Sequence, residues 1–235
     1  MTNAQRTNGQ RTADARETLR AIPLFAKISD DDLDDIVSHL IERRYPRNTT
    51  IVEEGLAGDY MYIIREGRVK VTKLSEDGRE KILEFLEEGS FVGEMALLER
   101  APRSASVKTL TPVRLLALSR TDFVGTLRRS PDLALSVIEV LCSRLRTQND
   151  QASALSFLSV KERTRNLLER LAKDPAKISG RVITPPLTHQ QMADMIGTSR
   201  ETVTRVVKEL KSGGWLTQDG KRYLIPNDDK FEFDY

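Results

Sequence analysis

The chain has 235 residues, of which 39% are hydrophobic and 31% charged, and its formal net charge is +2. This apolar content is enough for a core in two modest domains, and no apolar run approaches the roughly 18 residues that cross a bilayer. One cysteine (Cys142) and two histidines (His39 and His189) exclude an intrachain disulfide, a cysteine-ligated iron–sulfur cluster and a histidine-rich metal site, so no metal is expected.

The N-terminal part is predicted to be a tail followed by two helices. Residues 1–17 are rich in Thr, Asn, Gln and Arg, which is typical of a mobile tail, and they contain no apolar segment resembling a secretory signal. We therefore expect a cytoplasmic protein. The helices are predicted at 18–25 and 29–40, the second beginning at Ser29 and three aspartates, which suit a capped helix start.

From about residue 49 to residue 118 the sequence predicts short strands. The β-rich runs are 49–53, 60–65, 68–74, 81–86, 104–109 and 113–118, and turn glycines occur at 55, 67, 78 and 89. This spacing is typical of a compact antiparallel barrel or jelly roll, so we predict a β-roll domain at 18–130. Cupin enzymes hold a metal in a similar barrel, but that chemistry needs several inward histidines or carboxylates, and the histidines are missing. An enzyme is not expected.

A long helix is predicted after a short one at 121–127. Pro131 can open it, and it runs to about Leu158. Its apolar seam has strict spacing of three and four residues: Ile138, Leu141, Leu145, Gln148, Ala152 and Leu155. This period indicates pairing of two such helices, so 131–158 is predicted to be a dimerisation helix; the alternative is packing against the chain's own β-roll. Gln148, followed by Asn149, either fixes the register or contacts a ligand.

The segment 91–107 has the pattern of a phosphate-binding site. A short helix beginning at Gly93 and Glu94 would turn free amide groups toward an anion, and Pro102 would place Arg103 and Ser104 at the start of the next strand. An arginine suits a phosphate that is bound without a metal. Glu94 fits the same site if it accepts a hydrogen bond from a sugar hydroxyl. We call residues 93–104 the phosphate cassette.

The C-terminal part predicts a helix-turn-helix. After a helix at 160–172 and a polar loop at 173–184, two short helices at 187–207 are interrupted at Gly197, which can adopt the positive φ of a tight turn. Ser199 is a candidate N-cap for the second helix. Three side chains at the start of that helix, Arg200, Glu201 and Arg205, suit base edges in the major groove. The alternative is a pair of amphipathic helices with an ordinary charged face.

The residues that follow favour the DNA-binding interpretation. Two strand-like runs at 215–218 and 221–225 flank Asp219-Gly220, a strong hairpin signal, which predicts a winged helix. Residues 160–226 carry a net charge of +6, whereas residues 1–159 carry −1. Positive charge therefore gathers around the predicted reading helix, as neutralisation of DNA phosphates requires.

From about residue 20 to residue 226 the chain resembles the CRP/FNR superfamily of bacterial transcription regulators. The phosphate cassette is similar to the family's cyclic-nucleotide-binding motif, and residues 198–205 are similar to its recognition helix. The resemblance implies that Glu94 holds a ribose hydroxyl, that Arg103 and Ser104 hold a cyclic phosphate, and that Gly93 and Met95 line the same site. It also implies a DNA-binding set in which Arg200, Glu201 and Arg205 read bases, Gln190, Ser199 and Thr202 contact phosphates, and His189 and Lys208 lie beside them.

One departure from the family pattern concerns the effector. Cyclic-AMP regulators present a Thr-Ser or Thr-Asn pair on the dimer helix to the adenine, and the aligned pair here is Gln148-Asn149. Asn149 can still donate to and accept from a base edge, so cAMP is the expected effector. The alternative is an effector-independent regulator of the same family that binds DNA constitutively.

The fold expected from the whole sequence is α+β: an N-terminal β-roll or jelly roll, a long dimerisation helix, and a C-terminal winged helix-turn-helix domain at 159–235. The expected partners are double-stranded DNA with a palindromic operator and a second copy of the chain. The resemblance adds RNA polymerase, contacted through the loop 173–184 in an activator.

Overall fold

The computed structural model describes residues 13–76, 78–172, 174–175 and 180–227, and the chain divides into two compact units, 1–147 and 148–235. Residues 1–12 of the predicted tail lie outside the described residues. A helix covers residues 13–20, because Ala15 and Leu19, one turn apart, both enter the core. The first helix therefore starts before residue 18, inside the segment expected to be a tail, and it ends at residue 20, because the predicted helical residues 21–25 form turns.

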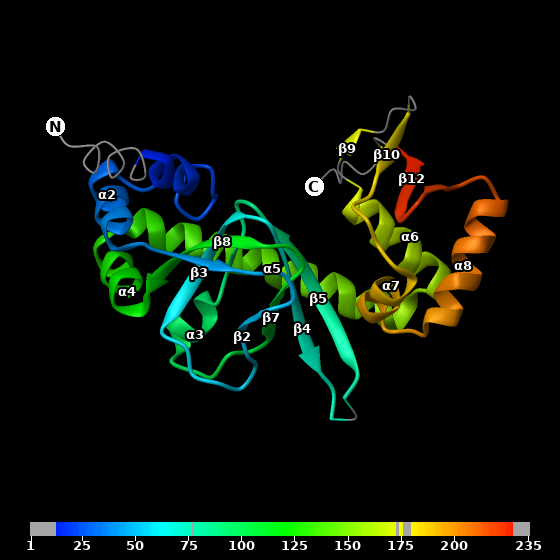
Figure 1. Ribbon diagram of the computed structural model, residues 1–235, viewed down its shortest axis with the longest axis horizontal. Helices are drawn as coiled ribbons and strands as arrows, with labels where there is room; N and C mark the ends of the chain where they lie inside the picture. Colours follow the sequence, from blue (N-terminus) through cyan, green and yellow to red (C-terminus); the bar gives the residue numbers. More distant parts are fainter. Residues whose placement is uncertain (1–12, 77, 173, 176–179, 228–235) are drawn as a thin grey trace. The chain divides into compact units, whose positions relative to one another are not determined.

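The first unit contains two antiparallel four-stranded sheets, which match the predicted β-roll (Figure 1). One sheet has the order β1-β8-β3-β6 and the other the order β2-β7-β4-β5. The strands of the first sheet are β1 (Ile41–Tyr45), β3 (Tyr60–Glu66), β6 (Phe91–Val92) and β8 (Val113–Ser119). Those of the second are β2 (Thr50–Val52), β4 (Arg68–Leu74), β5 (Glu80–Glu87) and β7 (Ser106–Thr109).

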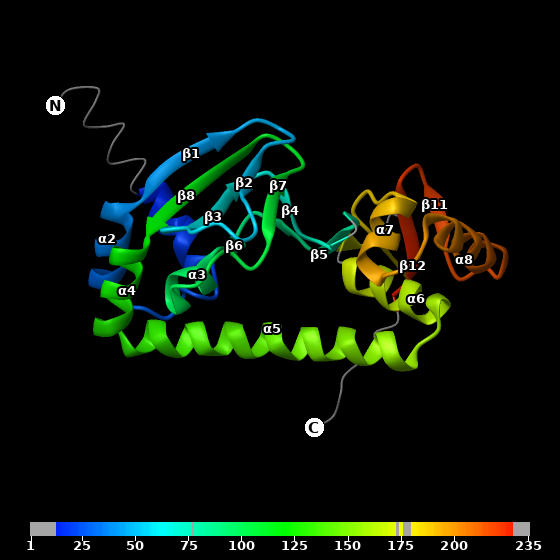
Figure 2. The ribbon, with the colours of Figure 1, turned by 90° about the horizontal axis from the view of Figure 1, so that it is seen from below.

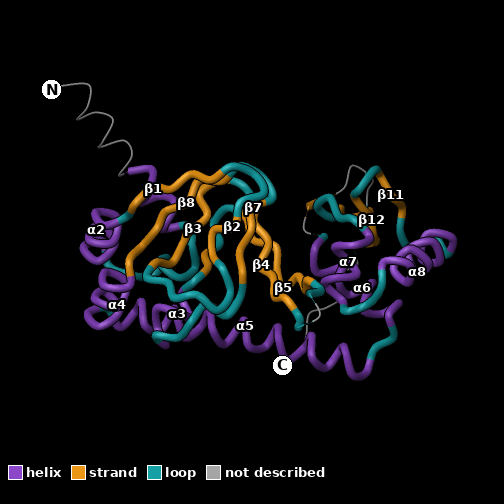
Figure 3. The backbone as a smooth tube through the Cα atoms, turned by 60° about the horizontal axis from the view of Figure 1, so that its bottom comes forward, coloured by secondary structure: helices purple, strands orange, loops and turns teal. Residues whose placement is uncertain are grey.

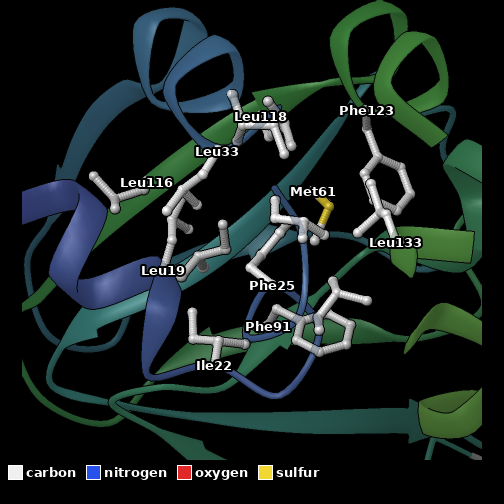
Figure 4. Close-up of a cluster of buried hydrophobic side chains, with 14 of the residues drawn as sticks. Leu19, Ile22, Phe25, Leu33, Met61, Phe91, Leu116, Leu118, Phe123 and Leu133 are labelled. Atoms are coloured by element: carbon white, nitrogen blue, oxygen red, sulfur yellow. The ribbon is translucent and has the colours of Figure 1, made fainter. Parts of the chain in front are cut away.

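Both faces of the first sheet are buried, each in a different core. Neighbouring residues of a strand point to opposite faces, so Ile63 packs against the helices while Ile64 packs between the sheets. The helix-side core takes in the helix at 13–20, α2 (Asp30–His39), α4 (Arg120–Arg129) and the start of α5 (Pro131–Phe157). Figure 4 shows side chains such as Phe25, Met61 and Phe123 converging there.

The long helix α5 is uninterrupted, as predicted (Figure 2). Its predicted seam is corrected at one position, because Leu141 is partly buried against the helix-side core instead of lying on the open face. One face of α5 thus packs on the chain's own first unit, through Leu133 and Val137 in particular. The opposite face carries exposed side chains at spacings of three and four residues, and we call them the α5 stripe: Leu135, Ile138, Cys142 and Leu145.

The second unit contains α6 (Val160–Leu171), α7 (His189–Ile196) and α8 (Arg200–Ser212) beside a small antiparallel sheet (Figure 3). The sheet has the order β11-β12-β10-β9. Its strands are β9 (Asp174–Pro175), β10 (Arg181–Ile183), β11 (Thr217–Asp219) and β12 (Arg222–Pro226). The predicted hairpin at Gly220 is confirmed, with φ of 57°. The prediction of a loop over 173–184 is wrong for 174–175 and 181–183, because pairing makes both segments strands. Residues 173 and 176–179 of that range lie outside the described residues.

The described ranges contain neither a membrane-spanning helix nor a metal-binding group of side chains. No helix there is both long and apolar enough to span a bilayer. Nor do three or more His, Cys, Asp or Glu side chains of those ranges gather into a group that could hold a metal ion.

Candidate functional site

The phosphate cassette is organised around a glycine in the left-handed conformation. Gly93 has φ of 92° and caps the start of α3 (Glu94–Glu99), directly after the short strand β6. A Cβ atom at this position would lie 2.5 Å from Nη1 of Arg103 and 3.3 Å from the carbonyl oxygen of Tyr60. Glycine is therefore required here both by backbone conformation and by the close approach of Arg103.

Arg103 is buried, with 7% of its surface exposed, and is held by backbone groups. Its Nη1 donates to the carbonyl of Gly93 at 2.9 Å, and its Nη2 donates to the carbonyl of Tyr60 at 2.5 Å. Its own amide donates to the carbonyl of Leu56 at 2.8 Å. A Cβ at Gly58 would lie 2.1 Å from Nε of Arg103, so a second glycine makes room for the guanidinium. The side chain is thus fixed in position.

The charge of Arg103 has no bonded counter-ion in the described part of the chain. Burial lowers the pKa of its guanidinium, and the nearby Tyr62, Asp59 and Glu94 only partly offset this. No carboxylate among the described residues forms an ion pair with it. A buried cation that is bonded only to carbonyl oxygens is costly, and that cost falls when an anion binds. The cassette is therefore suited to a negatively charged ligand.

Glu94 is the second charged group of the cassette, with 3% of its surface exposed. It forms an ion pair with Arg144 of α5, and Nη2 of Arg144 also donates to the carbonyl of Phe91 at 3.0 Å. The Arg144 guanidinium lies 4.8 Å from the centre of the Phe91 ring, a cation–π contact. Burial raises the pKa of the Glu94 carboxyl more than the charge of Arg144 lowers it.

The sequence did not indicate Arg144, although it joins the cassette to α5. It lies 50 residues from Glu94, and its only sequence signal is its place one helical turn before Gln148. Ser104 and Met95, both exposed, complete the cassette: Oγ of Ser104 lies 3.9 Å from Sδ of Met95. The structure thus brings together the predicted residues of the phosphate cassette, residues 93–104.

Gln148 and Asn149 were predicted to contact the ligand from α5. Both lie on that helix where the second compact unit begins, and both side chains are exposed. Their amide groups are open to a binding partner.

The helix-turn-helix forms the second site, within the second unit. Gly197, with φ of 67°, ends α7, and the Ser199 hydroxyl accepts a hydrogen bond from the amide of Thr202 at the start of α8, as predicted. A further cap was not predicted: Thr188 and Gln191 form a capping box on α7. α8 buries one face through Val203, Val206, Val207 and Leu210.

The opposite face of α8 presents polar and charged side chains. Arg200, Glu201, Arg205 and Lys208 are exposed and make no side-chain hydrogen bond or ion pair with any described residue. On α7, Gln190 donates to Asp194 at 2.7 Å, and Nδ1 of His189 lies 2.8 Å from the Thr204 hydroxyl. The sequence had not indicated Thr204. The predicted reading residues therefore share one open face, on which their charges are available to an external partner.

Comparison with known proteins assigns both sites to one family. The family profile described as "Cyclic nucleotide-binding domain" matches residues 42–130, and that described as "Crp-like helix-turn-helix domain" matches residues 162–232. The chain is 32% identical to the cAMP-activated global transcriptional regulator CRP of Pasteurella multocida, over 83% of this chain and 95% of that one. It is 29% identical to the CRP-like cAMP-activated global transcriptional regulator of Mycobacterium tuberculosis, over 91% of this chain and 96% of that protein.

A solved structure gives the same result at the level of the fold. The c-di-GMP responsive global regulator CLP of Xanthomonas campestris has a TM-score of 0.72 and 28% identity, covering 84% of this chain and 99% of that one. These relatives are transcriptional regulators, not enzymes. Since the matches include both the cassette and the helix-turn-helix, the chain belongs to the CRP/FNR family of cyclic-nucleotide-binding, helix-turn-helix transcription regulators.

Proposed function

We propose that the chain is a homodimeric, sequence-specific transcription regulator whose affinity for its operator is raised by a cyclic nucleotide, cAMP, bound in the phosphate cassette. In this proposal the β-roll spans 18–130, the dimerisation helix 131–158 and the winged helix-turn-helix 159–235. The regulator acts in the cytoplasm. RNA polymerase is a further proposed partner, contacted near the segment 173–184.

The observation that carries the effector site is the buried guanidinium of Arg103. It has no bonded counter-ion in the described residues, and two glycines leave the space that it occupies. A cyclic phosphate supplies the missing negative charge without a metal, and the exposed hydroxyl of Ser104 can donate to it. Glu94, an acceptor, suits a ribose hydroxyl beside that phosphate.

The identity of the base rests on α5 and on the relatives. Gln148 and Asn149 each offer an amide that can both donate and accept, which suits the edge of an adenine. The relatives from P. multocida and M. tuberculosis are named as cAMP-activated. cAMP is therefore the effector that the residues and the relatives together favour.

Dimerisation is supported by the α5 stripe. Exposed Leu135, Ile138 and Leu145 repeat at helical spacing on a helix of 27 residues, a pattern that a second copy of the same helix would cover. A two-fold dimer would present two α8 helices to a palindromic operator.

Coupling between ligand and DNA follows from the contacts of Glu94. Because this carboxylate already accepts from Arg144 of α5, a ribose hydroxyl that donates to it changes the strength of that ion pair. Ligand binding free energy can then favour one arrangement of the paired α5 helices over another.

Calorimetric titration of cAMP into the purified protein tests the effector site. We expect heat with the wild type and none with R103A at the same concentrations. R128A is the matched control, because Arg128 is an exposed arginine of α4, outside the cassette, and should bind like the wild type. Absence of heat from the wild type at millimolar cAMP would remove this effector.

Fluorescence anisotropy on an operator obtained by binding selection separates the proposal from its alternative. The proposal requires higher operator affinity with cAMP than without it. Equal affinity in both conditions would favour a constitutive regulator in which the cassette no longer controls DNA binding, an alternative that Gln148 at the base-contacting position suggests.

A further inference from the structure

A hydrogen-bonded chain joins the two helices of the DNA-binding motif. His189 is the first residue of α7, and its Nδ1 lies 2.8 Å from Oγ1 of Thr204, on the open face of α8. The Thr204 hydroxyl in turn donates to the carbonyl oxygen of Arg200 at 2.9 Å. Neither the predicted reading residues nor the family matches assign a role to Thr204.

This chain fixes the tautomer of the imidazole. A threonine hydroxyl has one hydrogen, and that of Thr204 is used on the Arg200 carbonyl, so its oxygen can only accept from His189. The proton of neutral His189 must then lie on Nδ1, which leaves a lone pair on Nε2. A lone pair repels a phosphate oxygen. Nε2 can donate to a phosphate only after the ring takes up a second proton.

The surroundings of His189 favour its neutral form in the free protein. Burial lowers its pKa, and the positive charge of Arg200 on α8 lowers it further. Asp194 is the acidic residue of α7. Its carboxylate accepts a hydrogen bond from Gln190 and is not among the causes of the shift in the pKa of His189. No charged group of α6 or of the β11–β12 hairpin shifts this pKa within the described ranges. The ring is therefore mainly uncharged near neutral pH.

We propose that Thr204 is a positioning residue that makes the contact of His189 with DNA phosphate depend on uptake of a proton. A phosphate brought to His189 stabilises the doubly protonated ring, which donates from Nδ1 to Thr204 and from Nε2 to the phosphate. DNA binding and protonation of His189 then favour each other. The inference rests on DNA binding by this helix-turn-helix, and it adds a dependence on pH.

The direction of the effect follows from linkage. The pKa of His189 is lowered in the free protein and rises when a phosphate is bound, so DNA binding takes up a proton between the two values. Affinity therefore increases as pH falls toward the free value and levels off below it. Affinity for duplex DNA is expected to fall roughly three- to tenfold between about pH 6.5 and about pH 8.

Fluorescence anisotropy of the full-length protein with a labelled random-sequence duplex, over that pH range at constant ionic strength, measures this dependence. A random duplex is sufficient because phosphate contacts do not require the operator. H189Q keeps an amide donor that does not titrate, so its pH dependence should be nearly flat. His39 is the other histidine of the chain, on α2 of the first unit, and H39Q should keep the wild-type slope.

A second variant isolates the role of Thr204. T204V keeps the branched shape but loses the hydroxyl, so neutral His189 is free to place its proton on Nε2 and donate to phosphate. Its pH slope should be flatter than that of the wild type. Nitrogen NMR shifts of the two histidines in the free protein should show His189 protonated at Nδ1 in the wild type and redistributed toward Nε2 in T204V, with His39 unchanged.

The outcomes separate this inference from the proposed function. DNA binding without a pH slope, or a slope that H189Q retains, would overturn the proton-linked contact while leaving DNA binding intact. A slope that T204V leaves unchanged would overturn the positioning role of Thr204. If no duplex is bound at any pH, the DNA-binding proposal itself fails.

Discussion

Glu94 is an acidic side chain held where an ionised carboxylate is unfavourable. Its pKa is raised mainly by burial, so folding favours the protonated form, and the stability that protonation supplies is lost as pH rises through the raised value. The proposed contact with a ribose hydroxyl has the opposite requirement, since a hydroxyl donates best to the ionised carboxylate. Nucleotide affinity should therefore fall as the solution is acidified toward that pKa.

The variant E94Q tests this opposition between stability and binding. It removes the charge, so we expect chemical denaturation at neutral pH to show unfolding stability no lower than that of the wild type. Nucleotide affinity measured by calorimetry should be about tenfold or more weaker and should lose its acid dependence. E99Q, at the exposed end of α3, is the control and should change neither property. A fully binding E94Q would contradict the role of this carboxylate.

Gly93 permits a second prediction at the level of a single residue. Gly93 and Gly89 both have positive φ, 92° and 82°. Of these two, only Gly93 would bring a Cβ against Arg103, whereas no described atom lies within 4 Å of a Cβ at Gly89. G89A should therefore cost about 1 kcal/mol from backbone strain alone. G93A should cost more and should also abolish nucleotide binding, because it displaces the guanidinium. Chemical denaturation and calorimetry of G89A and G93A measure stability and nucleotide binding. If the two variants lost the same stability and bound nucleotide equally well, the close contact between position 93 and Arg103 would be refuted.

The residues of the site were only partly predictable from the sequence. The shared location of Arg103 and Glu94 could be predicted because both belong to one local motif, residues 93–104. The contacts of Arg144 and Thr204 could not be predicted, because only the folded chain brings each of them near its partner. Local chemistry is readable in a sequence, whereas a contact over 50 residues depends on how helix and sheet pack.

The same limit applies to whole elements. β4 was predicted at its observed bounds, and α2 with its Ser29 cap, because alternation and capping are local signals. β1 was missed because it is an edge strand whose side chains are nearly all exposed, so its sequence does not alternate. β6 has two residues and β10 three, and both exist through pairing with a longer neighbour.

At the scale of one element, two basic side chains of α8 are expected to contribute differently to DNA binding: one by contacting bases and the other by its charge alone. Arg205 lies on its open face without a partner in the described residues, while Lys211 is exposed in the last turn. R205A should cost roughly 1–3 kcal/mol of operator binding and relax the preference at one base pair of each half-site. K211A should weaken binding slightly and equally for all sequences. Competition anisotropy with single-base operator variants distinguishes them, and an unchanged preference in R205A would exclude base reading.

For the whole molecule, the α5 stripe predicts a covalent test of the dimer. Cys142 lies on the stripe, so two copies paired along this face bring their thiols together. Mild oxidation should convert the 26.6 kDa chain into a species of about twice that mass on a non-reducing gel. C142S should prevent the crosslink but leave a dimer in light scattering.

A charged side chain on the α5 stripe should prevent dimerisation. L145D places a carboxylate on the stripe and should yield monomers, whereas S143D, at an exposed position beside it, should not. If the wild type is monomeric at micromolar concentration, dimerisation along α5 is wrong, and the expectation of a two-fold symmetric operator fails with it.

The two acceptors that hold Arg103 are main-chain carbonyl oxygens, those of Gly93 and Tyr60. Replacing the side chain of Tyr60 leaves its main-chain carbonyl oxygen in place, so this contact with Arg103 does not depend on the side chain at position 60. At Gly58 and Gly93, in contrast, a Cβ atom would intrude on the guanidinium of Arg103. Substitutions at Gln148 and Asn149, the proposed contacts to the base, would thus leave both carbonyl contacts of Arg103 in place. In the proposed function, the identity of the nucleotide could then change without loss of phosphate binding.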